Sequence, residues 1–321
     1  MNYYKLGNTG LKVSALCMGT MTFGKQADKA ASKKLYTLCR DKGINFFDCA
    51  NGYAGGESEK VLGRLIKKER SEVAIATKAY FPTGKDINAR GLSRFHLTKS
   101  LDASLKRLGT DYVDVFYLHH FDEQTPLRET LSTLNDFVRQ GKVLYLGISN
   151  FAAWQVMKAI AICQQHNFAP INCLQPMYNL VKRQCESEIL PMAESENLGV
   201  FPYSPLAGGL LTGKYRQQKP KVGRFNTNTM YQKRYEAARQ QESIQNYLDF
   251  AKANNYHPVS LAIAWAGSHS GVTAPIIGAR NVTQLKPALD SVNIDMTAEL
   301  RQKIAGFSLA PNIATDRTEE T

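Results

Sequence analysis

Residues 96–148 read HLTKSLDASLKRLGTDYVDVFYLHHFDEQTPLRETLSTLNDFVRQGKVLYLGI. Two segments with the apolar spacing of amphipathic helices, His96–Leu108 and Pro126–Gln140, are each followed by a short apolar run, Tyr112–Leu118 and Val143–Ile148. Apolar runs of this length are typical of strands buried on both faces, which a parallel sheet covered by helices requires. The stretch therefore predicts two successive helix–strand units of a parallel sheet.

The same alternation extends toward both ends of the chain. The apolar runs that we expect to form strands are Ala15–Met18, Asn45–Asp48, Val73–Thr77, Tyr112–Leu118, Val143–Ile148, Ile171–Leu174, Gly199–Tyr203 and Ala274–Ile277. Helical segments are expected at Asp28–Lys42, Ser58–Lys68, His96–Leu108, Pro126–Gln140, Ala152–Gln165, Cys185–Glu196 and Pro258–Ser268.

Eight such strands in 321 residues, with no break in composition, predict one (β/α)8 barrel, the TIM barrel of the α/β class. We expect it to form a single domain over residues 1–321. A doubly wound open sheet is the alternative, but that fold carries a GxGxxG loop after its first strand, and the sequence contains none.

Two segments are expected in addition to the barrel. Apolar and polar residues partly alternate in Tyr3–Leu6 and Leu11–Ala15, on either side of the turn sequence Gly7-Asn8-Thr9-Gly10, which predicts an N-terminal β-hairpin. The segment from Thr212 to about Arg239 is basic, aromatic and rich in turn residues. Long loops in compact domains are usually functional or flexible, and this one follows the seventh strand at the C-terminal mouth of the barrel.

The composition limits the classes of partner. The 40 basic and 28 acidic residues give a formal net charge of +12, but the basic residues are scattered among helices and one loop. We therefore predict no nucleic-acid partner, and a surface that attracts a small polyanionic ligand instead. The N-terminal residues lack the long apolar core of a signal peptide, and the longest uncharged run, Ala253–Ala279, is too polar for a membrane helix. A cytoplasmic protein without membrane contact is expected.

The cysteines and histidines show no metal-ligand spacing. The six cysteines form no CxxC pair, and most lie in apolar runs, so we expect reduced, buried thiols. The sequence contains no HExxH pattern, and the one histidine pair, His119-His120, is adjacent along the chain. No metal site is predicted.

Side chains that can donate a proton, or stabilise the group that donates it, lie at the ends of the predicted strands. Barrel enzymes carry their reactive residues at these positions. Asp48 ends the second strand, with Tyr53 in the loop beyond it, Lys78 ends the third, and His119 ends the fourth. Each residue alone has an ordinary structural explanation as an ion-pair partner, a core histidine or a turn aromatic. Four such residues on three successive strands favour a site.

This set of residues suits proton delivery to an oxygen that is becoming an alkoxide. A phenol has a free pKa of about 10, and a nearby ammonium lowers that pKa because it favours the phenolate. An aspartate beside the lysine keeps the ammonium charged and in place. A histidine can hydrogen-bond a carbonyl oxygen and orient it. This chemistry needs no metal.

At this point the sequence resembles the aldo-keto reductases, from the hairpin to about Leu289. The matching motifs are Phe47-Asp48-Cys49-Ala50-Asn51-Gly52-Tyr53 with Ser58-Glu59-x-x-Leu62-Gly63, Ile75-Ala76-Thr77-Lys78, Asp111-Tyr112-Val113-Asp114-x-x-Tyr117-Leu118-His119-x-x-Asp122, Gly147-Ile148-Ser149-Asn150-Phe151 and Gln175-x-x-Tyr178-Asn179.

The resemblance implies NADPH-dependent, reversible reduction of an aldehyde or ketone to an alcohol. In that reaction Tyr53 would be the general acid, or the base for alcohol oxidation. Lys78 would lower the pKa of Tyr53, Asp48 would pair with Lys78, and His119 would orient the carbonyl of a small substrate. The residues implied at the nicotinamide are Ser149, Asn150 and Gln175 on the carboxamide, Tyr203 stacked on the ring, and the backbone of Gly19 and Thr20 beneath it.

The run from Tyr203 to Tyr215, YSPLAGGLLTGKY, is similar to the pyrophosphate loop of one branch of the family, which includes potassium-channel β-subunits and related bacterial reductases. Small residues let backbone N–H groups approach phosphate oxygens. The contacts that this similarity implies are Ser204, Pro205, Leu206, Gly208, Leu210, Lys214 and, further along, Arg224. Gly208–Lys214 also matches GxxxxGK, but Tyr215 replaces the Ser or Thr that binds magnesium in nucleotide triphosphatases, so that interpretation is rejected.

The stretch Ile276-Ile277-Gly278-Ala279-Arg280-x-x-x-Gln284-Leu285 resembles the adenosine end of the same site. Its implied contacts are Ile277, Gly278, Arg280 and Gln284, with Arg280 placed for the 2′-phosphate that distinguishes NADPH from NADH. The chain departs from the family pattern at Pro287-Ala288, where relatives often have Glu-Asn. This departure predicts weaker contacts to the adenine.

Two other functions compete with the reductase. One is a slow-turnover, NADP(H)-sensing subunit of a larger assembly, which would keep the dinucleotide site. The other is a Schiff-base aldolase that uses Lys78, which would leave the Ser149-Asn150 pair, Gln175 and the Gly208–Lys214 loop without a role. The sequence leaves the natural substrate and a homo-oligomer open.

Overall fold

The structure, a computed structural model, describes residues 1–215, 229–235 and 238–315. The strands are β1 Tyr3–Lys5, β2 Lys12–Ser14, β3 Cys17–Gly19, β4 Phe46–Asp48, β5 Ala74–Ala79, β6 Val113–Leu118, β7 Val143–Ser149, β8 Ile171–Gln175, β9 Gly199–Val200 and β10 Ile276–Ile277. The α-helices are α1 Lys29–Asp41, α2 Glu57–Ile66, α3 Arg94–Leu108, α4 Leu127–Arg139, α5 Ala153–Gln165, α6 Ile189–Ser195, α8 Thr229–Arg234, α9 Ala238–Ala253, α10 Pro258–Gly267, α11 Val282–Leu289 and α12 Ala298–Ala305. The short 3-10 helices are η1 Tyr53–Gly56, η2 Arg70–Glu72, η3 Gln184–Glu186, η4 Ala207–Thr212 and η5 Asp290–Asn293.

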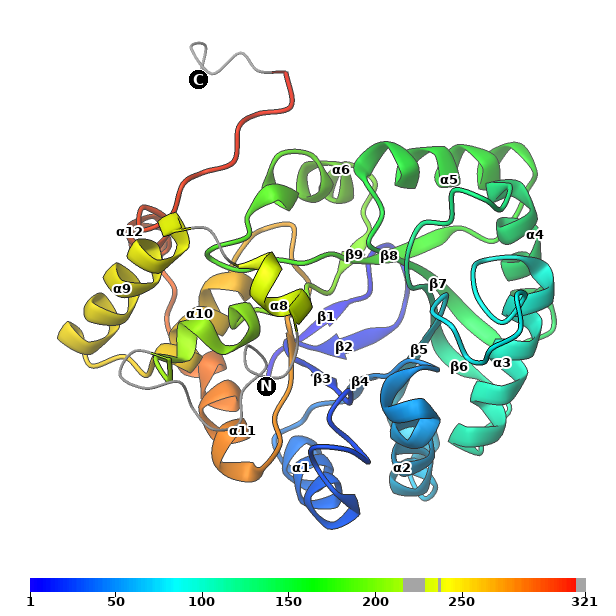
Figure 1. Cartoon of the computed structure of the whole chain (residues 1–321), viewed down its shortest axis with the longest axis horizontal. Helices are drawn as coiled ribbons and strands as arrows, with labels where there is room; N and C mark the ends of the chain where they lie inside the picture. The colour runs from blue at the N-terminus through cyan, green and yellow to red at the C-terminus, as the bar shows by residue number, and fades with distance from the viewer. Residues whose placement is uncertain (216–228, 236–237, 316–321) are drawn as a thin grey trace.

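Strands β3 to β10 form one sheet of eight parallel strands in the order β10-β3-β4-β5-β6-β7-β8-β9. Its two ends meet, because the N–H of Ile276 donates to the carbonyl of Pro202 at 2.9 Å and the N–H of Thr273 donates to that of Val200 at 2.9 Å. Helices lie around the sheet on its outer side (Figure 1). The predicted (β/α)8 barrel is therefore confirmed, and each predicted apolar run overlaps one of the eight strands.

The N-terminal hairpin covers the bottom of the barrel. Strands β1 and β2 pair antiparallel, as predicted. The turn glycine Gly7 has φ +53°, and a Cβ there would lie 2.7 Å from the backbone of Asn172, Asn197 and Gly199. Only a residue without a side chain allows this close approach to the start of β8 and β9. The hairpin and the barrel strands together fill the barrel interior. The buried side chains there are Leu6, Val13, Cys17, Phe46, Ala74, Ala76, Val115, Tyr117, Cys173, Phe201, Ala274 and Ile276.

A second, larger core lies between the sheet and the helices. All six cysteines are buried and free. Among the helices that the structure describes, none is long and apolar enough to cross a membrane.

Several predicted elements are shorter than expected, and in two of them a proline explains the difference. The segment Cys185–Glu196 is not one helix but η3 followed by α6, because Pro191 has no N–H for a helix that starts earlier and is tolerated only in a first turn. The seventh strand ends at Val200, since Pro202 cannot donate a ladder hydrogen bond. The long segment after the seventh strand includes α8 and the start of α9, and residues 216–228 and 236–237 of it lie outside the described residues.

Close packing of α2 on α3 depends on Gly63. A Cβ at this position would lie 2.2 Å from the carbonyl oxygen of Leu108, the last residue of α3. Gly63→Ala is therefore expected to lower the free energy of unfolding by about 1–3 kcal/mol, because overpacking forces the two helices apart. Urea denaturation measures this change. Gly10→Ala is the matched control, since a Cβ there meets nothing within 4 Å, and an equal loss in both variants would contradict the packing argument.

Candidate active site

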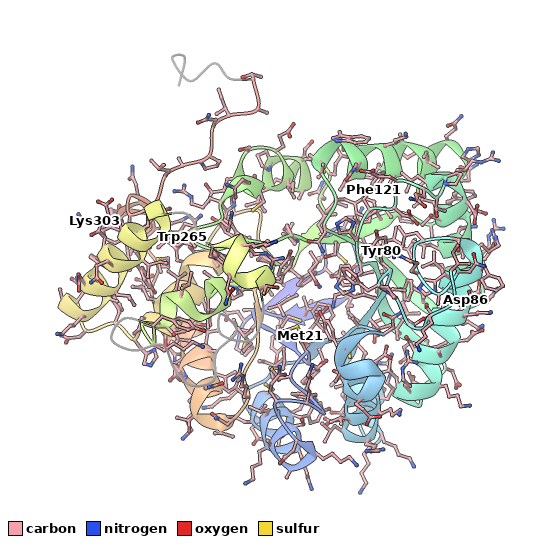
Figure 2. The ribbon with its side chains drawn as sticks, viewed as in Figure 1. Met21, Tyr80, Asp86, Phe121, Trp265 and Lys303 are labelled. Carbon is pink, nitrogen blue, oxygen red and sulfur yellow. The ribbon has the colours of Figure 1, made fainter. Side chains whose placement is uncertain are left out.

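The predicted catalytic residues lie together at the C-terminal end of the barrel. Asp48 ends β4, Lys78 lies near the end of β5, His119 directly follows β6, and Tyr53 opens η1 in the loop after β4. Figure 2 labels Met21, Tyr80 and Phe121, which lie on the loops after β3, β5 and β6 and so mark this end of the barrel.

Lys78 is the centre of the site. Its side chain is fully buried, and its Nζ donates to Asp48 Oδ2 at 2.6 Å, to the Cys49 carbonyl at 2.6 Å and to the Tyr53 hydroxyl at 3.5 Å. Burial lowers the pKa of Lys78, but the charge of Asp48, the nearby Tyr53 phenol and the hydrogen bond that Lys78 donates to Asp48 raise it by more, so the net pKa lies above its usual value. A buried ammonium is thus fixed beside the phenol.

Asp48 has a second partner that the sequence did not reveal. Gln175, at the end of β8, donates from Nε2 to Asp48 Oδ1 at 2.9 Å, while Lys78 binds the other carboxylate oxygen. Both oxygens of the buried carboxylate therefore accept a hydrogen bond, one from Lys78 on the neighbouring strand β5 and the other from Gln175 on β8. No sequence spacing links a glutamine and an aspartate 127 residues apart, so only the closed barrel shows this contact.

The Tyr53 hydroxyl keeps its proton. Lys78 lowers the pKa of Tyr53, as the family resemblance implied, but burial raises that pKa by more, with smaller contributions from Asp48 and Cys49, and the result is a pKa of about 12. The resting site therefore holds a neutral phenol next to an ammonium. This is an acid that can release its proton only to a strong base such as a developing alkoxide.

The loop that carries Tyr53 has an unusual backbone. Three successive residues, Ala54, Gly55 and Gly56, have φ of 51°, 64° and 92°. Two of them are glycines, for which the left-handed region costs little, and Gly56 caps the start of α2. This turn places the phenol over Lys78, with the ammonium 5.0 Å from the centre of the Tyr53 ring.

His119 is uncharged in this setting. Burial, followed by the charges of Lys78 and His120, lowers its pKa well below the usual value. Its ring lies 6.1 Å from the ring of Tyr53 at an interplanar angle of 76°. Within the described residues, its buried Nδ1 has no hydrogen-bond partner. A neutral imidazole beside the phenol can orient a carbonyl oxygen by a hydrogen bond.

The residues expected around a nicotinamide form one hydrogen-bonded chain. The Tyr203 hydroxyl donates to Asn150 Oδ1 at 2.7 Å, Asn150 Nδ2 donates to Ser149 Oγ at 3.0 Å, and Ser149 Oγ donates to the Gln175 carbonyl at 2.8 Å. Asn150 Nδ2 also donates to the His119 carbonyl at 2.9 Å. These amide and hydroxyl groups therefore stand next to the Tyr53–Lys78 pair.

The predicted phosphate loop has the backbone of an anion cradle. Ser204, Ala207, Gly208 and Gly209 have φ of 60°, 50°, 68° and 100°. Non-glycine residues in this region store strain and cluster at ligand sites. A Cβ at Gly209 would lie 2.7 Å from Lys214 Nζ, so the ammonium is close to the loop backbone. A loop of small residues with an ammonium beside it fits a pyrophosphate.

The first and last barrel strands bring the remaining cofactor residues together. Thr20 donates from its N–H and its hydroxyl to the Asp48 carbonyl, at 2.8 and 2.9 Å. A Cβ at Gly19 would lie 2.8 Å from Ile276 Cγ2 and 3.2 Å from the Ile277 carbonyl, and one at Gly278 would lie 3.8 Å from the Gly19 carbonyl. The residues predicted to contact the cofactor at the ends of β3 and β10 thus lie side by side.

Beyond β10, the side chain of Gln284 accepts from the N–H of Arg280 at 3.1 Å, which joins the two residues predicted at the adenosine end. Among the other predicted contacts, Pro205, Leu206 and Leu210 lie in or beside η4. Arg224 lies outside the described residues.

A family model described as the aldo/keto reductase family matches residues 15–308. The chain belongs to this family. It is 36% identical over 312 residues to an uncharacterized oxidoreductase of Bacillus subtilis, with 94% of each chain covered. It is 37% identical over 332 residues to a probable voltage-gated potassium channel subunit beta of Oryza sativa, with 95% of each covered, and 35% identical over 309 residues to one of Arabidopsis thaliana, with 92% covered.

Helix α2 supports the active site of this aldo/keto reductase from behind. Ser58 Oγ donates to the Thr20 carbonyl at 2.7 Å, which ties the helix to the loop after β3. The fully buried Glu59 accepts from Thr77 Oγ1 at 2.5 Å and from Arg107 Nε at 2.6 Å, which ties the helix to β5 and α3. Ser58 and Glu59 therefore hold α2 against the loop after β3 and against β5, the strand that carries Lys78.

Aromatic rings form one side of the mouth of the reductase. The ring of Phe81 lies 4.9 Å from that of His119, and Tyr80 stacks on His120 at 5.1 Å. Trp154, which is 59% exposed, meets the ring of Phe121 at 6.1 Å. His120 is exposed and belongs to this rim. In the part of the chain that the structure describes, no group of three His, Cys, Asp or Glu side chains could hold a metal ion.

Proposed function

We propose that this oxidoreductase uses NADPH to reduce a small aldehyde or ketone to an alcohol, with the chain acting as one domain. The observation that carries the proposal is the buried Lys78 ammonium, fixed by Asp48 and placed 3.5 Å from the hydroxyl of a protonated Tyr53. NADPH, when bound, supplies the hydride that the carbonyl carbon needs. The side chains of this chain orient the carbonyl, give the proton to its oxygen and stabilise the phenolate that remains.

Each of the four proposed catalytic residues has its own role in the reaction. His119, uncharged, donates a hydrogen bond to the carbonyl oxygen and turns it toward the phenol. Tyr53 gives its proton to that oxygen as negative charge develops there. Lys78 stabilises the phenolate that remains, because its ammonium is held within hydrogen-bond distance of the hydroxyl. Asp48 keeps the ammonium charged.

The cofactor residues fit a nicotinamide dinucleotide. Ser149, Asn150 and Gln175 offer amide and hydroxyl groups for the carboxamide, η4 and Lys214 offer a cradle for the pyrophosphate, and Arg280 offers a guanidinium for a 2′-phosphate. The net charge of +12 favours such a polyanion.

The site argues against a Schiff-base aldolase. A lysine nucleophile must be uncharged to attack a carbonyl. Lys78 instead donates to two oxygens at 2.6 Å, and its pKa is raised. The lone pair needed for attack is therefore occupied by a proton.

Oxidation of NADPH by 4-nitrobenzaldehyde tests the proposal, since the aromatic rim suits an aromatic aldehyde. Turnover of the unmodified chain supports a reductase. Saturable NADPH binding without turnover supports the alternative of a slow, NADP(H)-sensing subunit, which the likeness to proteins named as probable potassium channel β-subunits favours. Absence of NADPH binding would refute both.

Arg280→Ala is expected to reduce the preference for NADPH over NADH, measured as the ratio of their kcat/KM values, by about tenfold or more, because a charge-assisted hydrogen bond to the 2′-phosphate is lost. Lys303→Ala is the matched control. It removes the same charge from an exposed position of α12, at the left edge of the molecule in Figure 2. An equal change of the ratio in both variants would show a general charge effect and would count against the assignment of Arg280.

A further inference from the structure

A cavity of about 320 Å³ lies beside α3, outside the site described above. Its walls are α3 itself, the segment between β5 and α3, and Asn51 from the loop after β4. Asp86, on its rim, lies at the edge of the molecule in Figure 2, well away from Met21 at the barrel mouth. We refer to this space as the α3 cavity. Its volume falls in the range of small-molecule sites.

The most deeply buried residues that line the α3 cavity are polar. Asn51, His96 and Ser100 are 4%, 2% and 5% exposed. His96 Nε2 and Ser100 Oγ lie 3.2 Å apart and satisfy each other. Asn51 differs, because neither its Nδ2 nor its Oδ1 has a hydrogen-bond partner among the described residues. A buried amide without partners is costly, so a group inside the cavity is expected to pair with it.

The rim of the α3 cavity carries two cations and one carboxylate. Lys99 has no carboxylate within ion-pair distance in the described part of the chain, and its ammonium lies 3.8 Å from the centre of the Phe95 ring. Arg107 is half-buried and donates to Glu59 and Ser104 through Nε and Nη2. Asp86 is exposed, and its Oδ1 accepts from the N–H of Asn88. The charge of Arg107 is balanced by its ion pair with Glu59, so Lys99 is the lining cation that a ligand can use, and in a strongly basic protein it favours an anion.

The outer wall of the cavity is fixed in place. The N–H of Gly91 donates to the Tyr80 carbonyl at 2.8 Å, and that of Thr83 donates to the Ala89 carbonyl at 2.9 Å, so the segment folds back on itself. Asp122 accepts from the N–H of Leu92 at 2.8 Å and anchors the segment to the loop after β6. The cavity is thus built before any ligand arrives, as small-molecule sites usually are.

We propose that the α3 cavity is a second ligand site, which takes a small organic anion carrying hydroxyl groups. Lys99 pairs with the anionic group at the rim, and the hydroxyl groups pair with the amide of Asn51 at the floor. This inference does not rest on the proposed reaction. Asn51 lies two residues before Tyr53, and its N–H donates to the Lys78 carbonyl at 3.1 Å, so the second site adjoins the catalytic loop.

Isothermal titration calorimetry of the full chain with glycerol 3-phosphate tests the proposal, with glycerol as the uncharged probe. We expect saturable binding of one molecule of glycerol 3-phosphate with a Kd below about 1 mM, and weaker binding of glycerol. Lys99→Gln should weaken the binding of glycerol 3-phosphate by about fivefold, as loss of one exposed charge contact implies. Ala103→Phe, which places a ring in the cavity, should abolish it.

Lys106→Gln is the matched control, because it removes the same charge from an exposed position of α3 that does not line the cavity. Its affinity should equal that of the unmodified chain. Thermal denaturation of each variant shows whether it is folded, and Lys99→Gln, at an exposed position, keeps the test valid if Ala103→Phe does not fold. Absence of saturable binding would overturn the proposal. So would binding that Arg280→Ala weakens and Lys99→Gln does not, since the probe would then occupy the cofactor site.

Discussion

Tyr53→Phe is expected to lower kcat for NADPH oxidation by about 10²- to 10⁴-fold, the usual contribution of a positioned general acid. Among the described groups hydrogen-bonded to the Lys78 ammonium, the phenol alone carries a proton that it can give to the substrate, and its pKa of about 12 keeps that proton in place until an alkoxide develops. Phenylalanine keeps the ring and its packing. Steady-state kinetics with 4-nitrobenzaldehyde measure the rate, and fluorescence titration measures the affinity for NADPH, which should change little.

Tyr80→Phe provides the control for this experiment. Tyr80 lies on the aromatic rim, where its ring packs on those of Phe81 and His120. Loss of its hydroxyl should leave kcat within about threefold, since a rim contact is made equally in the ground state and the transition state. If both variants lost activity to the same extent, or if Tyr53→Phe kept its activity, Tyr53 would not be the acid.

Lys78→Met has the second large effect, and it acts on both stability and rate. The substitution leaves the Asp48 carboxylate buried without its ion-pair partner, so the free energy of unfolding should fall by about 3–5 kcal/mol. It also removes the charge that stabilises the phenolate of Tyr53, so the rate should fall by at least about 100-fold. Urea denaturation and NADPH oxidation measure the two effects.

The double variant Asp48→Asn with Lys78→Met separates these two effects. A neutral amide can still accept from Gln175, and no unpaired charge remains buried, so most of the lost stability should return. Activity should not return, because the ammonium is still missing. A double variant that regained activity would show that Lys78 matters only for folding.

Much of the fold was predictable because each strand is buried on both faces and therefore appears as an apolar run. Tyr112–Leu118 and Val143–Ile148 match β6 and β7 to within one residue at each end. Two of the errors lie where a proline interrupts an otherwise regular pattern, at Pro191 and Pro202. In both cases the missing N–H outweighs the apolar periodicity.

That the candidate catalytic residues lie together was also predictable, since strand ends converge in a barrel. What the sequence could not show depends on contacts between distant segments. The hydrogen bond from Gln175 to Asp48 joins β8 and β4, which lie on opposite sides of the barrel mouth. Whether the pKa of Tyr53 rises or falls depends on how far the effect of burial exceeds that of the nearby ammonium. No sequence motif shows which of the two effects is larger. The α3 cavity depends on the path of the segment between β5 and α3.

The most direct test of the central claim is to follow the label from [4-²H]NADPH into the product. The unmodified chain is incubated with 4-nitrobenzaldehyde and NADPH that carries deuterium at the transferred position, and the alcohol is analysed by mass spectrometry. We expect one deuterium on the alcohol carbon for each NADPH oxidised. We also expect Tyr53→Phe to form none of this product. Alcohol without deuterium, or NADPH binding without any alcohol, would contradict the central claim.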